Sequence, residues 1–158
     1  MGVVGSMKKF WINYLGQSMS PLLQDDDQIL IESINPDQLN YGDVVLFLDQ
    51  QSRELTLHRL IEFPLQTKGD FSLAYEANAN EALLGRAIGF ERKDYFRKFP
   101  ASHSRFTKVF LLLSKLRMQG RTSRRIALGM LFILTKIFQF YSDKTKLNYN
   151  KEQFLADL

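Results

Sequence analysis

The hydrophobic pattern of this chain changes period once, and the change divides the sequence into two parts. Up to about residue 92, short apolar runs alternate with polar turns, which is typical of β-strands. Beyond the segment 99–102, which contains a proline, apolar residues recur at the spacing of one face of an α-helix. We therefore predict an α+β protein, with a mainly β unit over residues 7–92 and an apolar, basic helical region over residues 93–158.

Net charge follows the same division. Residues 1–92 contain seven Lys/Arg and thirteen Asp/Glu, a net −6, whereas residues 93–158 contain fourteen and four, a net +10, which together give +4. Opposite charges on two parts of a chain indicate different partners for them. There is no cysteine, and the histidines are His58 and His103. We therefore expect no disulfide bond, no thiolate chemistry, no metal site and no cofactor.

Apolar runs in the first part predict five strands, at residues 29–31, 44–48, 55–61, 71–75 and 84–90. The second and third are joined by a polar link and are expected to form a hairpin. Gly85 and Gly89 are expected to break the last one. Before these strands, residues 8–15 carry aromatic side chains at helical spacing and predict a short amphipathic helical turn.

Two helices are predicted in the basic part. The first places these residues on one face: Phe106, Val109, Phe110, Leu113 and Leu116. It is expected to end near Gly120, and the second, capped by Thr122 or Ser123, to run to about Tyr141. That second helix is apolar but too short and interrupted for a predicted membrane span.

Arg124 and Arg125 lie in the first turn of the second predicted helix, where the helix dipole is positive. This placement costs roughly 0.3–1 kcal/mol per charge at a surface, so an anionic group nearby is expected to compensate. Two interpretations of the hairpin at residues 105–141 stay open. Either it packs its apolar faces on the β unit, or it attaches to an anionic membrane surface. No nucleic-acid partner is expected, because the basic part has no recognition motif for one.

A serine lies within the stretch Gly16-Gln17-Ser18-Met19-Ser20-Pro21. Alone, such a cluster indicates an ordinary turn. Three later stretches follow it, at residues 41–47 (YGDVVLF), 57–61 (LHRLI) and 67–70 (TKGD). In that order and at those spacings, the set resembles the serine-protease family of type I signal peptidases, which also includes the self-cleaving SOS-type repressors. The resemblance runs from about Leu15 to Phe90.

The resemblance implies a serine endopeptidase in which Ser18 is the nucleophile. Where bacterial members usually carry a lysine base, this chain has His58, so it is similar to the serine–histidine branch of the family. A neutral imidazole, with a reference pKa of about 6.5, can accept the serine proton near neutral pH. Lys68, which lies past the expected position of a lysine base, is the lesser alternative.

The family's third catalytic member is an acid that orients the imidazole, and two candidates are available. Asp70 belongs to the Gly-Asp box and is favoured, while Glu76 follows six residues later and stays an alternative. Outside catalysis, Asp70 would cap a turn and Glu76 would be a solvated charge at a strand edge. The activity is thus predicted to rest on a Ser–His dyad or a Ser–His–acid triad.

Three further residues are assigned to substrate binding and to the nucleophile turn. Gly16 stands where many members have a second serine that helps to stabilise the oxyanion, so backbone N–H groups near Ser18 are the expected donors. Met19 and Pro21 match the motif and are expected to shape the turn. After the proline, Asp26 replaces a glycine of the family pattern, in a turn that we expect to be structural.

By resemblance, the substrates are precursor or leader peptides, or precursor proteins, cut after small residues during peptide maturation. The alternative is a non-catalytic binding or regulatory module of the same fold that acts through its basic helical hairpin. Signal peptidases normally have a membrane-spanning helix just before the serine. We see neither such an anchor nor a signal peptide before Ser18 and expect a cytoplasmic or peripheral membrane location.

Overall fold

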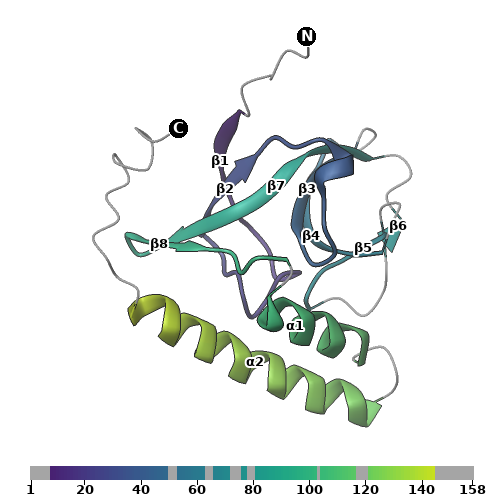
Figure 1. Ribbon diagram of the computed structural model, residues 1–158, viewed down its shortest axis with the longest axis vertical. Helices are drawn as coiled ribbons and strands as arrows, with labels where there is room; N and C mark the ends of the chain where they lie inside the picture. Colours follow the sequence, from purple (N-terminus) through teal and green to yellow (C-terminus); the bar gives the residue numbers. More distant parts are fainter. Residues whose placement is uncertain are drawn as a thin grey trace.

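The computed structural model describes residues 8–49, 53–62, 66–71, 76–77, 81–102, 104–116 and 121–144. Within them, eight strands form one sheet and two helices follow (Figure 1). The elements are β1 (Lys9–Asn13), β2 (Gln28–Glu32), the 3-10 helix η1 (Pro36–Gln38), β3 (Val44–Asp49), β4 (Leu55–Glu62), β5 (Gln66–Lys68), β6 (Glu76–Ala77), β7 (Glu81–Arg92), β8 (Tyr95–Lys98), α1 (Arg105–Leu116) and α2 (Arg121–Lys144). The predicted α+β class is confirmed.

The sheet is antiparallel at every strand pairing in the described part of the chain, in the order β1-β2-β7-β3-β4-β5-β6. The predicted hairpin of residues 44–48 and 55–61 is confirmed, since β3 pairs with β4 and places Val45 opposite His58. The strand β8 pairs with β7, so the sheet continues beyond residue 92. Most of the strand candidate at residues 71–75 lies outside the described residues.

The prediction that Gly85 and Gly89 break the last strand is wrong. Strand β7 runs through both glycines, and its pairings with β2 and β3 shift register beside them. A Cβ atom on Gly85 would lie 2.5 Å from the carbonyl oxygen of Glu32, and one on Gly89 would lie 2.3 Å from the ring of Phe96. The glycines therefore allow neighbouring chain segments to approach closely at bulges in a long, twisted strand.

The helical turn predicted for residues 8–15 is also wrong, because residues 9–13 form β1. Trp11 lies opposite Leu30 of β2 and packs edge-on against the ring of Phe96, with centroids 5.9 Å apart. In so short a run the aromatic spacing fits either period, and pairing with the edge of β2 decides for the strand.

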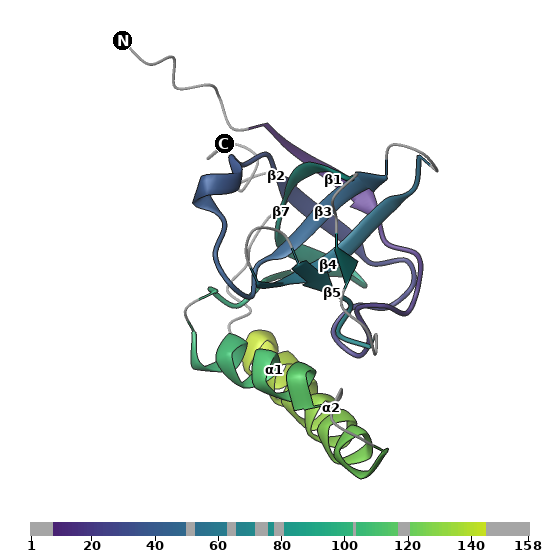
Figure 2. The same ribbon diagram turned by 90° about the vertical axis from the view of Figure 1, so that its right-hand side faces the viewer.

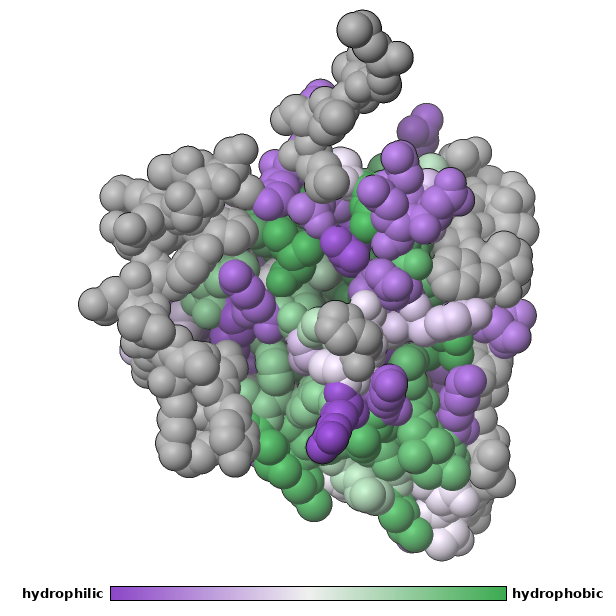
Figure 3. Space-filling model, in the orientation of Figure 1, coloured by the Kyte–Doolittle hydropathy of each residue, from purple (hydrophilic) through white to green (hydrophobic). Residues whose placement is uncertain are grey.

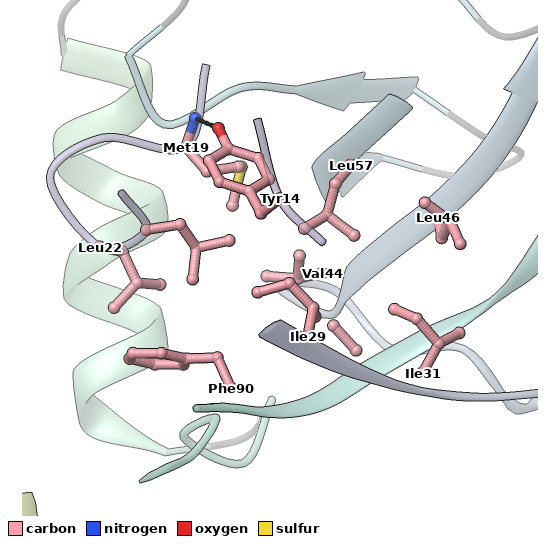
Figure 4. Close-up of a cluster of buried hydrophobic side chains, with 11 residues drawn as sticks. Tyr14, Met19, Leu22, Ile29, Ile31, Val44, Leu46, Leu57 and Phe90 are labelled. Carbon is pink, nitrogen blue, oxygen red and sulfur yellow. Dashed lines mark hydrogen bonds between the residues drawn. The ribbon is translucent and has the colours of Figure 1, made fainter. Parts of the chain in front are cut away.

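The main core lies between the sheet and the segment that joins β1 to β2 (Figure 4). Its buried members are Tyr14, Met19, Leu22, Leu23, Ile29, Ile31, Val44, Leu46, Leu57, Ala87 and Phe90. Met19, which follows Ser18, thus belongs to the core and is fully buried, whereas Gln17 on the other side of Ser18 is exposed. Close packing of this kind holds the serine turn in one position.

The two helices lie side by side at one end of the molecule, beyond the strands (Figures 1 and 2). They pack on each other through Phe110, Leu113, Ala127 and Leu131. Val109, predicted to share the packed face of α1, is exposed instead. Gly120 lies outside the described residues, and in the described part of the chain no helix is long and apolar enough to cross a membrane.

Helix α1 rests on the β unit at Gly42, in the turn before β3. Gly42 has φ of +90°, and a Cβ atom there would lie 2.2 Å from the Cγ2 atom of Thr107 in α1. Both the backbone conformation and the space therefore require glycine at this position.

Two glycine-to-alanine substitutions should have opposite effects on stability. Gly42→Ala should lower the free energy of unfolding by at least about 2 kcal/mol, through backbone strain and the clash with Thr107. In the matched control Gly129→Ala, the added methyl meets nothing within 4 Å in helix α2. This control should raise the free energy of unfolding by up to about 1 kcal/mol. Denaturant titration measures both, and a Gly42→Ala variant as stable as the wild type would contradict this packing of α1.

Candidate active site

Ser18 lies, partly buried, in the turn between β1 and β2. The N–H of Ser20 donates to the carbonyl oxygen of Gln17 at 3.0 Å, and the Ser20–Pro21 peptide bond is cis. Gly16 has φ of +132°, which favours glycine, and its N–H donates to Oδ1 of Asp25 at 2.7 Å. These residues of the predicted motif thus build a compact turn around the serine.

Tyr14, which the sequence analysis did not single out, places its hydroxyl beside Ser18. Its Oη atom accepts a hydrogen bond from the N–H of Met19 at 3.0 Å (Figure 4) and lies 3.4 Å from Oγ of Ser18. Because Met19 donates to it, the tyrosine can direct its own proton toward Ser18 or toward a group bound there. The sequence does contain one indication of this contact: a tyrosine lies four positions before the serine, and a buried tyrosine hydroxyl needs a hydrogen-bond partner.

The acidic turn after the serine is structural, as predicted. Asp26, which stands where the family pattern has glycine, adopts φ of +70°, a conformation that glycine favours and that aspartate tolerates. The carboxylate of Asp27 is buried, accepts from the N–H of Gln24 at 2.9 Å and pairs with Arg92 of β7. These contacts fix the turn to the sheet.

Ser18 and His58 line the same cavity, which has a volume of about 420 Å³. Ser18 comes from the turn, whereas His58 comes from β4 and is nine-tenths or more buried. The other lining residues are Ile12, Asn13, Tyr14, Leu15, Leu46, Leu55, Thr56 and Leu57. The structure thus brings the residues predicted as nucleophile and base to one cavity of mixed polar and apolar lining, between the end of β1 and β4.

The Gly-Asp box lies directly against the backbone of Ser18. The N–H of Phe71 donates to the carbonyl oxygen of Ser18 at 2.7 Å. A Cβ atom on Gly69 would lie 2.6 Å from the same oxygen, so a larger residue would push the two segments apart. Two stretches that are distant in sequence, 16–21 and the Gly-Asp box with Phe71, are therefore in contact.

Asp70 forms a buried, bidentate ion pair with Arg59. Nε of Arg59 donates to Oδ1 and Nη2 donates to Oδ2, each at 2.8 Å. Arg59 also donates to the carbonyl oxygen of Gly42 at 2.9 Å, and its guanidinium lies 5.1 Å from the ring centroid of Phe110. Asp70 therefore lies beside the serine turn, with Arg59 bound to both of its carboxylate oxygens. Its predicted role in orienting His58 stays a prediction.

The two remaining candidates lie on the neighbouring strands. Lys68 of β5 is fully buried, and its Nζ donates to the carbonyl oxygen of Gly69 at 3.2 Å, so its amine lies in the loop that contacts Ser18. Glu76 begins β6, where its backbone pairs with Thr67 of β5. Both stay alternatives, Lys68 as a base and Glu76 as the acid.

Among the residues that the structure describes, no group of three or more His, Asp or Glu residues is placed to hold a metal ion. A scan of the chain against protein-family models gives no match. A search of curated proteins likewise gives no significant match.

The Arg59–Asp70 pair should contribute more to the free energy of unfolding than an exposed ion pair does. Asp70→Asn and Arg59→Met each leave a buried charge without its counter-ion, and each should lower the free energy of unfolding by about 3–5 kcal/mol. The double variant should lose much less than the sum, because it removes both charges.

Lys9→Met is the matched control, because it removes the partly exposed Lys9–Glu32 pair at 3.7 Å. It should lower the free energy of unfolding by about 1 kcal/mol or less. Denaturant titration of all four variants gives the coupling energy. Additive effects of Arg59→Met and Asp70→Asn would show that the pair is not coupled as its geometry implies.

Proposed function

We propose that the chain is a serine endopeptidase in which Ser18 is the nucleophile and His58 the general base. The observation that carries the proposal is that both residues line one cavity of about 420 Å³. The resemblance of the serine turn, the hairpin β3–β4 and the Gly-Asp box to those of signal peptidases supports it. The contact of that box with the backbone of Ser18 supports it further.

The reaction proceeds through an acyl-enzyme. His58 accepts the proton of the Ser18 hydroxyl as Oγ attacks the substrate carbonyl, and it then donates that proton to the leaving amine. A water molecule, activated by the same imidazole, hydrolyses the ester. Backbone N–H groups near Ser18 stabilise the oxyanion, and the Tyr14 hydroxyl, 3.4 Å from Oγ of Ser18, is a further donor at the same place.

The substrates are precursor or leader peptides. Five of the ten residues that line the cavity are leucine or isoleucine and the others carry polar groups, which suits a short segment of peptide. The preference for small side chains at the cleavage site is what the resemblance implies. The rival proposal is a binding module that has kept the fold but not the chemistry. It predicts an unreactive Ser18.

Covalent labelling separates these proposals without knowledge of the substrate. A fluorophosphonate probe should add one adduct to the wild-type protein by intact mass, because His58 activates the Ser18 hydroxyl. Ser18→Ala should abolish the adduct, and His58→Ala should slow its formation by at least about a hundredfold. Ser33→Ala is the matched control and should label at the wild-type rate.

A folded wild-type protein that stays unlabelled would favour the binding module. Fast labelling of His58→Ala together with slow labelling of Lys68→Ala would transfer the base role to Lys68.

The acid is tested by comparing Asp70→Asn with Glu76→Gln. Asp70→Asn should slow labelling more, since Asp70 lies in the loop that contacts Ser18. Because this variant also disturbs Arg59, rates should be compared at a temperature where circular dichroism shows both variants to be folded. A larger loss in Glu76→Gln would assign the third role to Glu76, and wild-type rates in both would leave a Ser–His dyad.

A further inference from the structure

The outer face of α2 carries an apolar stripe that nothing in the described structure covers. Its members are Ile126, Met130, Ile133 and Ile137, at successive spacings of four, three and four residues. Ile126 and Ile133 are 60% and 61% exposed, and the other two are exposed by nearly half. At 100° per residue the centre of the stripe lies roughly 110° around the helix axis from Ala127 and Leu131, which pack on α1.

Other apolar residues of the two helices are exposed as well. They are Val109 and Leu112 of α1 and Phe132 of α2. In the orientation of Figure 1, hydrophobic residues cover much of the molecular surface over the two helices (Figure 3). Single exposed apolar residues are ordinary, whereas a stripe over three helical turns indicates a surface that is covered in use.

The charged residues of this part of the sequence are all of one sign. Residues 105–137 contain eight Lys/Arg and no Asp/Glu: Arg105, Lys108, Lys115, Arg117, Arg121, Arg124, Arg125 and Lys136. Arg125 and Lys136 are exposed and fall within about 20° of each other along one side of the stripe. An apolar stripe with a cationic border is the pattern of a helix that lies in the plane of a membrane interface.

We propose that the outer face of α1 and α2 docks on the surface of an anionic lipid bilayer. The apolar stripe enters the headgroup region while the flanking lysines and arginines pair with lipid phosphates. A second copy of the chain fits less well, because two such faces would bring like charges together. The net charge of −6 on residues 1–92 repels the same membrane and so orients the protein with its helices toward the lipid.

This proposal does not depend on the protease activity, since it uses a different surface. It also reconciles the two interpretations of the hairpin. The inner faces pack on each other and on the β unit, while the outer faces stay available for lipid.

Vesicle co-sedimentation with the full chain tests the proposal. The protein should sediment with vesicles of equal parts phosphatidylglycerol and phosphatidylcholine, and much less with phosphatidylcholine alone. Raising the ionic strength well above about 0.15 M, where the Debye length is about 8 Å, should weaken binding. Arg125→Glu/Lys136→Glu should weaken it at least about tenfold, because each basic residue near an anionic surface contributes about 1 kcal/mol.

Two further double variants complete the test. Ile126→Ser/Ile133→Ser should also reduce binding, and because both side chains are exposed, circular dichroism should show an unchanged fold. Lys8→Glu/Arg53→Glu is the matched control, since it makes the same charge change at exposed positions of the β unit. It should bind like the wild type.

Three results would overturn the proposal. The first is no sedimentation with anionic vesicles at low salt. The second is equal binding to neutral vesicles. The third is a dimer in light scattering that Ile126→Ser/Ile133→Ser converts to a monomer, which would identify the stripe as a contact between two copies.

Discussion

The buried guanidinium of Arg59 is the contact on which the arrangement of the site depends. It binds both carboxylate oxygens of Asp70, donates to the carbonyl oxygen of Gly42 and lies against the ring of Phe110 in α1. A buried cation is stable only where its N–H groups have hydrogen-bond acceptors. Through these contacts the Arg59 side chain connects the loop beside Ser18, the turn before β3 and helix α1. Because Arg59 follows His58 in β4, the same contacts hold the strand that carries the proposed base.

Because of these contacts, the two sides of the helical hairpin differ in what they do. Its inner side, through Phe110 and Thr107, closes the β unit over Arg59 and Gly42. Its outer side carries the apolar stripe and the basic residues, which the packing does not use. Helix α1 contacts Arg59, which in turn pairs with Asp70 beside the serine turn, so lipid binding and catalysis can be compared in the same variants.

The sequence predicted those features that depend on local pattern. The β3–β4 hairpin and the two helices follow from clear apolar periods, and their class was correct. The prediction of a helical turn at β1 is wrong because a short aromatic run fits the helical period as well as the strand period. Only its pairing with β2 in the folded chain distinguishes the two. The sequence predicts breaks at Gly85 and Gly89, whereas the strand continues, because the atoms that these glycines accommodate come from other segments, Glu32 and Phe96. Tyr14 and Arg59 were missed because their importance lies in contacts made only in the folded chain. The roles of Ser18 and His58 are implied by the resemblance to signal peptidases, and the structure adds that both residues line one cavity.

The proposed peptide hydrolysis through Ser18 is tested by profiling cleavage of a complex peptide library with the purified full chain. New termini should appear predominantly after small residues, and they should disappear in a folded Ser18→Ala variant while remaining in Ser33→Ala. Cleavage that persists in Ser18→Ala, or a folded wild-type protein that produces no Ser18-dependent termini with anionic vesicles present, would contradict the assignment.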